Sequence, residues 1–510
     1  MKVWLLAIEA LDENDSPITL RFSSGQYDDP DGNYWDNRLK QPALYRAGMY
    51  TGQYIQVDRS GYGEIVLINN DGGLNYLVDY AFDGRPCLSI VYDTETETLD
   101  DVFFATTSRV GFTNTDISII LRDPVEVFRE DHPRTYYLGD NVLPDGLEGV
   151  EDDIKGLPKP RVYGAVSNGS PVLVNSSKLI YQISDRDVTI THAYDRGFPL
   201  TRESDYTSLA QLESTEPSAG SFKCFEGYVR LGSMSMGQVT VDAECVEQGV
   251  GSVLQSVLID LGYLLTSAVI NTLNAKGNIR LFLSTSEVST ENLINTIIDS
   301  VCGYWRVTKE GDIDAGTIIL PKTTPDYQIY DWQILRIDRT SIGSGTNGVP
   351  IKAVEILADR IHTVQTDLAS AIMSGEDDIT LIYGGSPNST YDVITNTDRI
   401  ARLSEEYRNV IVDCPTCANR HLLAETLTIA SQLSSLNDAE NIATELLSAV
   451  KVRRDTVNVT VRFSELVNIA VGDTVEIFTD RIGYNNGRLM VVIGLTLDAS
   501  SNEYEIRLWG

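Results

Sequence analysis

The chain has 510 residues, and because one hydrophobic core rarely serves so many, we expect about three or four domains. Its 40 Lys and Arg against 73 Asp and Glu give a net charge of −33. An acidic surface of this kind repels nucleic acid and anionic lipid, and no basic cluster beyond Arg453 and Arg454 stands out, which argues against a nucleic-acid reader. General solubility is the simplest explanation of the acidity. The alternative explanation is that the acidic residues form a surface past which DNA slides without binding.

Neither a secretion signal nor a membrane anchor is expected. The apolar run at residues 3–8 ends at Glu9, with further acidic residues close behind. The most apolar long stretch, residues 257–270, contains Asp260 and Gly262 and falls short of the roughly 20 residues of a membrane span. Six cysteines in 510 residues do not make a disulfide scaffold. We therefore expect a protein made in the cytoplasm.

Residues 1–154 predict an N-terminal β domain. Short apolar runs alternate with turn clusters, of which residues 70–73 (Asn-Asp-Gly-Gly) are the clearest. Strands at this spacing are typical of a barrel or a sandwich. The predicted strands cover residues 3–9, 18–22, 63–69, 86–92, 101–108 and 117–122.

A proline-rich stretch separates this domain from the next. Pro158 and Pro160 flank Lys159, and each proline fixes φ and pushes the residue before it towards extended geometry. We therefore interpret residues 151–164 as a stiff crossover between two bodies. Residues 155–250 then predict a second β-rich domain, with strands at 162–181, 188–194, 228–231 and 238–242.

Residues 251–345 predict an α+β domain. Apolar residues recur with a period near 3.6 over residues 251–271, which indicates one amphipathic helix. Ser289 is a suitable N-cap for a second helix over residues 290–300. A hairpin follows, with strands at 302–307 and 316–320 and its turn at 309–312.

Residues 346–510 predict a C-terminal β domain with two helices, so the whole chain is expected to be mainly β with an α+β middle. Residues 391–402 and 409–413 are ambiguous. Turns are expected at 485–487 and 500–502. The predicted helices cover 421–433 and 438–450, and the predicted strands cover 351–357, 379–383, 455–463, 472–478, 489–497 and 503–509.

Motifs for catalysis and nucleotide binding are weak or missing. Residues 343–348 match G-x-G-x-x-G, but Val349-Pro350 and a predicted strand follow instead of the helix that a dinucleotide site needs. We interpret this segment as an interdomain loop. The sequence contains no P-loop and no G-x-S-x-G nucleophile motif. No catalytic or cofactor-binding residue is therefore predicted, and no cofactor.

Two segments resemble metal sites only in part. Cys414, Cys417 and His421 have metal-like spacing, but a closed zinc site needs four ligands and the nearest other cysteine is Cys302. Two thiols beside a turn, free or loosely paired, are favoured, and a bound metal is the alternative. Residues 27–33 are rich in Asp, yet aligned to an EF-hand loop they put Tyr27 first and Arg38 last, where carboxylates are required. We predict no metal ligand here.

Several stretches resemble the tail hub, or baseplate hub, proteins of long-tailed bacteriophages, of the siphophage and gene-transfer-agent type. These are Lys-Gly-Leu-Pro-Lys-Pro-Arg-Val-Tyr-Gly at 155–164 with Pro-Val-Leu-Val at 171–174, residues 63–73 with Asp-Gly-Arg at 83–85, Ile-Asp-Ser-Val-Cys-Gly-Tyr-Trp at 298–305, and the ending at 453–461, 472–475 and 504–509. The resemblance covers most of the chain in order, and none of its motifs is catalytic.

This resemblance implies a structural protein and not an enzyme. Such hubs are trimers at the tail tip of the virion, and their N- and C-terminal tail-tube-like barrel domains present six similar units to a six-fold tube. The middle closes or narrows the channel. The implied partners are the distal tail protein, the tail tube or tape-measure protein, and the tail fibre or receptor-binding proteins. DNA passes through without specific binding.

Two other functions stay open. A glycan-binding, adhesin-like β protein would explain the many strands and the 25 tyrosines. A glycan-degrading tail enzyme would need two carboxylates roughly 5–10 Å apart in a cleft, which spacing along a chain does not reveal.

Overall fold

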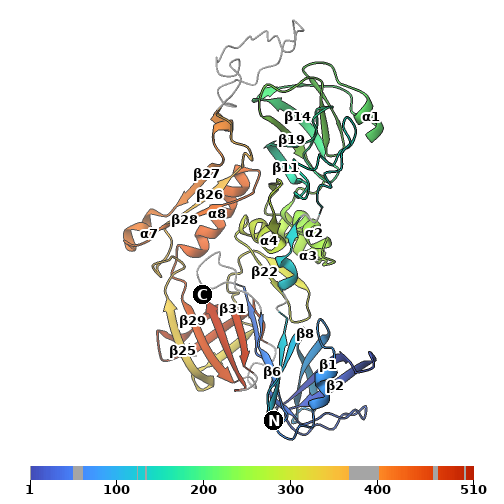
Figure 1. The fold of residues 1–510 in the computed structure, drawn as a ribbon. Coiled ribbons are helices and arrows are strands. Elements are labelled where there is room, and N and C mark those ends of the chain that lie inside the picture. Colours follow the sequence, from blue (N-terminus) through green and yellow to red (C-terminus); the bar gives the residue numbers. More distant parts are fainter. Residues whose placement is uncertain are drawn as a thin grey trace.

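The computed structural model describes residues 2–49, 61–122, 125–132, 135–366, 401–462, 469–498 and 501–510. The chain is elongated and arranged in tiers (Figure 1). Two β domains lie side by side at one end, two smaller units with helices lie in the middle, and a further β body forms the other end. The predicted class, mainly β with an α+β middle, is confirmed. The predicted strand at 379–383 lies outside the described residues.

The N-terminal domain is one seven-stranded sheet in the order β2-β1-β7-β8-β9-β6-β3. Its strands alternate buried and partly exposed residues, as in β9, where Ile117, Ile119 and Leu121 are buried. The edges approach each other at a single bridge between Phe22 and Asp36. The strands are β1 (Lys2–Leu11), β2 (Pro17–Ser23), β3 (Leu39–Gln41), β6 (Glu64–Ile68), β7 (Pro86–Asp93), β8 (Thr98–Phe112) and β9 (Asp116–Leu121). The 3-10 turn η1 (Asn75–Asp79) lies between β6 and β7.

The C-terminal domain is a second sheet, whose strands follow the order β24-β30-β31-β32-β29-β25. Its edge strands β24 and β25 are separated only by the short η3, so the sheet must curl back on itself. They precede residue 346, the predicted start of this domain. The elements are β24 (Tyr327–Tyr330), η3 (Asp331–Gln333), β25 (Ile334–Ser341), β29 (Thr456–Arg462), β30 (Thr474–Thr479), β31 (Tyr484–Asp498) and β32 (Glu503–Trp509).

Two details differ from the expectations for these domains. Among the described strands, neither sheet is hydrogen-bonded into a closed barrel, since each leaves two edge strands. The turn expected at 485–487 lies inside β31. The chain reverses just before it, where Ile482 and Gly483 both have positive φ, 54° and 82°. Two consecutive left-handed residues suit the twist of a hairpin turn.

The β body at the far end consists of two five-stranded sheets, ordered β15-β14-β19-β11-β20 and β12-β13-β18-β17-β16. Side chains such as Val166, Ile183 and Phe222 fill the core between them. The strands are β11 (Arg161–Gly169), β12 (Val172–Asn175), β13 (Ile180–Gln182), β14 (Thr189–Asp195), β15 (Phe198–Pro199), β16 (Thr201–Arg202), β17 (Ser221–Phe225), β18 (Tyr228–Leu231), β19 (Val239–Glu244) and β20 (Arg280–Leu283), with helix α1 (Leu209–Ser214) between β16 and β17.

The proline-rich segment enters this body and does not leave the first domain. The segment before it packs on the same body, because the buried Tyr137 donates its hydroxyl to Gln182 and Asn141 donates to the Val174 carbonyl. Lys159 donates its backbone N–H to Thr135, and β11 begins directly after Pro160. Residues 151–156 form turns, where an extended crossover was predicted, and the extended part is β11 from Arg161 on. The chain left the first sheet already after β9.

Three helices and a hairpin form one of the middle units. The helix expected over 251–271 is two, α2 (Val250–Ile259) and α3 (Ser267–Asn274), because Gly262 takes a φ of +83° and Thr266 caps a new helix start. Helix α4 (Thr290–Asp299) confirms the prediction, with Ser289 as its N-cap. The elements η2 (Glu126–Arg129) and β10 (Asp131–His132), which pairs with β21 (Val288–Ser289), lie against α4. Strands β22 (Tyr304–Val307) and β23 (Ile313–Gly316) form the predicted hairpin, but its return strand ends where the predicted strand over 316–320 was to begin.

The other middle unit is a three-stranded sheet ordered β27-β26-β28 with helix α8 packed on it. The helix predicted over 421–433 is wrong, because residues of that segment pair in parallel with β26 and leave Leu422 and Leu423 exposed. Helix α8 was predicted correctly. The elements are β26 (Ala353–Ala358), β27 (Arg408–Asp413), α7 (Pro415–Arg420), β28 (Thr426–Ala430) and α8 (Leu436–Val450). Across the described chain, no helix combines the length and apolar character that crossing a membrane requires.

Candidate assembly site at the junction of the two β domains

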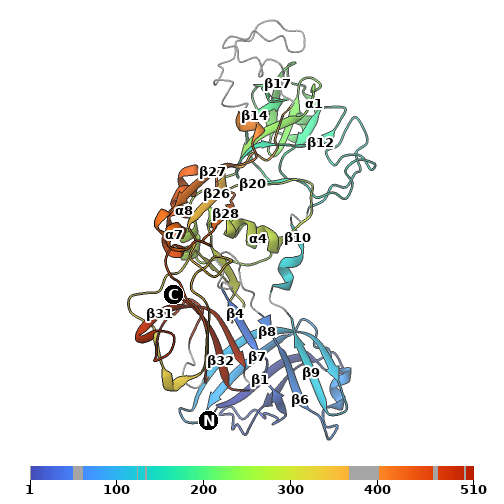
Figure 2. The same cartoon turned by 90° about the vertical axis from the view of Figure 1, so that its left-hand side faces the viewer.

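A backbone ladder joins the two β domains. Strand β4 (Tyr45–Gly48) belongs to the N-terminal part of the chain, yet it pairs antiparallel with the second half of β31, where Ala47 faces Leu495. The first half of β31 pairs with β30 instead. Figure 2 shows β4 beside the C-terminal sheet. A single 15-residue strand therefore holds its own sheet together and also carries a strand from the neighbouring domain.

Aromatic side chains hold β4 against the N-terminal sheet. Tyr62, in β5 (Gly61–Tyr62), which pairs with β4, donates its hydroxyl to the Phe104 carbonyl of β8 at 2.8 Å. The rings of Tyr45 and Tyr62 both lie against Phe103, with centroids 5.8 and 4.9 Å away. Packed aromatic pairs add stability beyond the area they bury. The β4–β5 hairpin is thus fixed on one side to β8 and on the other to β31.

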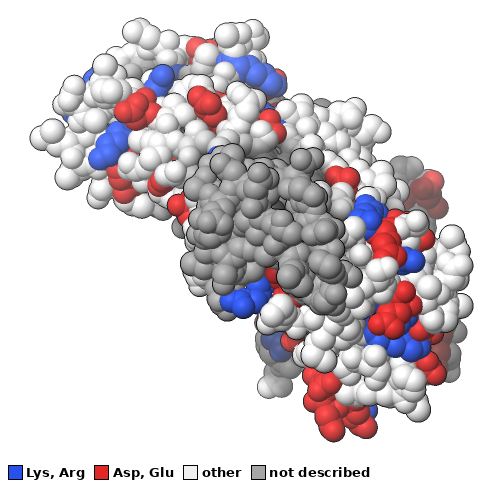
Figure 3. Space-filling model, turned by 90° about the horizontal axis from the view of Figure 1, so that it is seen from above, with Lys and Arg blue, Asp and Glu red and all other residues white. Residues whose placement is uncertain are grey.

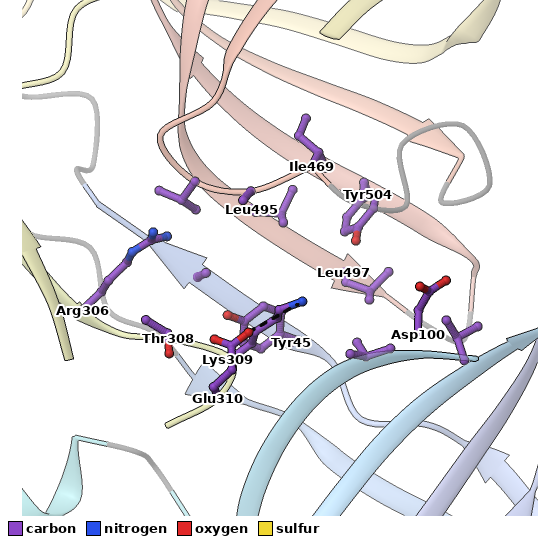
Figure 4. Close-up of a pocket in the computed structure, with 15 residues that line it drawn as sticks. Tyr45, Asp100, Arg306, Thr308, Lys309, Glu310, Ile469, Leu495, Leu497 and Tyr504 are labelled. Atoms are coloured by element: carbon purple, nitrogen blue, oxygen red, sulfur yellow. Dashed lines mark ion pairs between the residues drawn. The ribbon is translucent and has the colours of Figure 1, made fainter. Parts of the chain in front are cut away.

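The third body at this junction is the β22–β23 hairpin. Phe104 donates its backbone N–H to the Lys309 carbonyl in the hairpin turn, at 2.8 Å. A cavity of about 330 Å³ lies where the three bodies meet (Figure 4). It is lined by Tyr45 from β4, Asp100 from β8, Arg306 from the hairpin, and Tyr504 from β32, among others.

The basic side chains of the hairpin at the cavity lie near acidic ones. Arg306 is paired with Asp314 at 2.9 Å, and Lys309 lies 3.8 Å from Glu310. Burial raises the pKa of Tyr45 to about 12, so its hydroxyl stays protonated at neutral pH. The described lining also includes the polar side chains of Asp100, Thr308 and Glu310.

The segments that suggested chemistry in the sequence lie in three different surroundings. The 343–348 loop joins β25 to β26, as predicted, and Thr346 donates to Glu425 across it. In the Asp-rich turn, Asp29 accepts hydrogen bonds from its own neighbours Asn33 and Trp35. Cys414 and Cys417 lie at the start of α7 and His421 follows its end. Within the described part of the chain, no three His, Cys, Asp or Glu side chains are grouped to hold a metal.

Buried ion-pair clusters were missed by the sequence reasoning. Arg161 pairs with Asp185 at 2.5 Å and with Asp260 at 2.9 Å, joining the far β body to the end of α2. Asp359, directly after β26, accepts from Arg280 of β20 and lies 3.2 Å from Arg402, so this cluster joins the β26 sheet to the far β body. The partners are separated by 24 to more than 90 residues in sequence, so no local pattern signals them.

Charges of both signs share the face seen from above. Figure 3 shows Lys and Arg interspersed with Asp and Glu over the visible parts of this face. The excess of carboxylates therefore does not gather there into one large acidic field.

The geometry defines a class, a multidomain, mainly β protein whose C-terminal sheet takes in a strand, β4, from the N-terminal part of the chain. No protein-family model matches the chain, and no curated protein does. Among solved structures, it is similar to tail proteins. A tail protein from Neisseria meningitidis MC58 is 9% identical over 99% of this chain and 96% of that one, with a TM-score of 0.38.

Two prophage proteins are similar at the same level. The 43 kDa tail protein of prophage MuSo2 from Shewanella oneidensis is 7% identical over 100% of this chain and 97% of its own, with a TM-score of 0.41. Prophage tail protein gp18 from Listeria monocytogenes EGD-e is 7% identical over 100% and 94%, with a TM-score of 0.35. TM-scores below 0.5 do not demonstrate a common fold, so the assignment below rests on the chain itself.

Proposed function

We propose that this chain is a structural subunit of a bacteriophage tail, and that its place there is the trimeric baseplate hub. The observation that carries the proposal is the β4–β31 ladder. It locks two coiled β domains side by side in one chain. Three such chains would supply six β domains to a ring, which is what the sequence resemblance to tail hubs implies.

In this proposal the two β domains form the ring next to the distal tail protein. The middle units and the far β body close or narrow the channel, contact the tail tube or tape-measure protein, and anchor the fibre or receptor-binding proteins. The net charge of −33 suits a channel that DNA passes without specific binding during ejection. The protein acts at the tail tip of the virion, and it is not an enzyme.

The test is native mass spectrometry of the full chain, alone and with the distal tail protein of the same tail. We expect a species of three chains, either alone or in the presence of that partner. A chain that stays monomeric in both samples contradicts the hub.

The same preparations distinguish the other functions. Binding of cell-surface polysaccharide by a monomer would favour the adhesin-like protein. Release of reducing ends from that polysaccharide would favour the glycan-degrading enzyme.

A further inference from the structure

Helix α7 begins with two thiols in different surroundings. Cys414 is the N-cap residue and is partly exposed, whereas Cys417, on the first turn, is 5% exposed. The Cys417 thiol donates to the Ile351 carbonyl at 3.3 Å. The Cys417 backbone N–H donates to the Cys414 carbonyl at 3.0 Å. This one-turn contact brings the two cysteine residues close together.

The two sulfur atoms differ in reactivity because their surroundings differ. The Cys414 sulfur lies 3.3 Å from the Thr416 hydroxyl. That hydroxyl and the Cys417 backbone N–H lower the pKa of the Cys414 thiol, because both can hydrogen-bond a thiolate. Burial raises the pKa of Cys417. An accessible thiol with a lowered pKa beside a buried partner thiol is the arrangement in which one sulfur reacts first and the other resolves.

The other cysteines do not share this arrangement. Cys87, Cys224 and Cys302 are buried, and burial raises the pKa of each. Cys245 is partly exposed like Cys414, but burial also raises its pKa, and its thiol donates to the Glu247 carbonyl at 2.8 Å. Cys245 is therefore a natural internal control.

We propose that Cys414 and Cys417 form a reversible dithiol–disulfide pair, a modification site where α7 contacts the segment that leads into β26. The N-cap residue Cys414 has φ −133° and ψ 88°, outside the helix, so its side chain can turn towards Cys417 without unwinding α7. A disulfide needs the two Cβ atoms about 4 Å apart, slightly closer than helical neighbours usually are.

The oxidant is a small disulfide such as oxidised glutathione. The Cys414 thiolate attacks one glutathione sulfur, forms a mixed disulfide and releases the first glutathione thiolate. Cys417 then loses its proton to solvent, and its sulfur attacks the Cys414 sulfur. The Cys414–Cys417 bond forms as the bond to glutathione breaks, releasing the second glutathione. Two protein thiols are oxidised and one glutathione disulfide is reduced.

The bridge would act on the connection between the C-terminal sheet and the neighbouring middle unit. Cys414 donates its backbone N–H to the Lys352 carbonyl, just before β26. Forming the bridge removes the Cys417 hydrogen bond to Ile351 and cross-links the first turn of α7. The exposed Leu422 and Leu423, directly after α7, would then be presented by a stiffer helix. Reduced cytoplasm keeps such a pair open, and an oxidising exterior closes it.

The experiment uses the full chain, reduced, then equilibrated with mixtures of oxidised and reduced glutathione. After an acid quench, free thiols are alkylated in denaturant and the cysteine peptides are weighed. We expect the peptide with Cys414 and Cys417 to lose two hydrogens and both alkyl groups in the oxidising mixtures. The buried cysteines should stay fully alkylated.

Two variants separate the proposed route from simple surface oxidation. Cys417→Ser should trap glutathione on Cys414, which the unmodified chain should not accumulate. Cys245→Ser should leave formation of the bridge unchanged. The proposal is overturned if Cys414 and Cys417 stay alkylated in every glutathione mixture in which Cys245 stays alkylated. It is also overturned if glutathione remains on Cys414 in the unmodified chain to the same extent as in Cys417→Ser.

Discussion

Replacing Arg161 by Met should loosen the far β body from the helices beneath it. Arg161 and Asp185 have side chains only 6% and 4% exposed, and two parallel hydrogen bonds of 2.7 and 2.5 Å join them. Removing one partner of a buried pair leaves the other charge uncompensated, which costs about 3–5 kcal/mol. Asp260 keeps its second partner, Arg186, at 2.7 Å, so the loss centres on Asp185.

Hydrogen exchange of peptides from β11 measures this loss locally, which avoids assuming two-state unfolding in a multidomain chain. We expect protection to fall by about a hundred- to a few-thousand-fold, since each 1.4 kcal/mol is about a factor of ten. Adding Asp185→Leu to Arg161→Met should restore most of it. Arg186→Met, at a half-exposed pair, should cost about 1 kcal/mol or less. Equal losses in Arg161→Met and Arg186→Met would refute the reasoning.

Three further changes test single side chains. Burial raises the pKa of Asp299 to about 6, so the folded state binds this proton more tightly than the unfolded state does. The free energy of unfolding should therefore fall as the pH rises from about 4 to about 6. At neutral pH, thermal melts of Asp299→Asn should show a gain in stability of about 1–2 kcal/mol. Burial, with Arg161 nearby, lowers the pKa of His132 to about 4, so stability should rise between about pH 4 and 6.5, and melts of His132→Gln should lose that rise. Gly164→Ala should cost about 2–4 kcal/mol by urea unfolding, because φ is +71° and a Cβ would meet the Ile279 carbonyl oxygen at 1.7 Å; an unchanged midpoint would contradict this.

Local sequence patterns predicted those elements whose partners lie close in the chain. Helix α4 was recognisable from its Ser289 cap and apolar stripe, and the β22–β23 hairpin from its turn. The helix expected over 421–433 failed because β26, more than 60 residues earlier, recruits Thr426–Ala430 into a parallel pair. Leu422 and Leu423 fit a helical spacing in the sequence, but both side chains are exposed in the structure. Tertiary pairing overrode local propensity there.

The junction of the β domains was beyond reach for the same reason. Tyr45–Gly48 is a four-residue strand whose partner, β31, lies about 450 residues later. Neither segment carries a mark of this pairing, because any apolar strand with a free edge can accept another. Two β domains could be predicted from the sequence, but nothing in it indicated that β4 pairs with β31.

That shared ladder decides how the two domains can move. A hinge between domains needs a connection that bends without breaking hydrogen bonds, and the β4–β31 pair offers none. Tyr62 and Phe104 fix the hairpin from one side, while Ile493 accepts a hydrogen bond from Met49 on the other. The two β domains should therefore move as one block. Motion between the two β domains and the middle units must instead occur where fewer strands connect them, at the β22–β23 hairpin. This hairpin contacts β8 through the hydrogen bond from the Phe104 N–H to the Lys309 carbonyl. A ring built from such blocks would keep its diameter while the middle and far units change position, and this is the mechanical property that a channel with a movable closure requires.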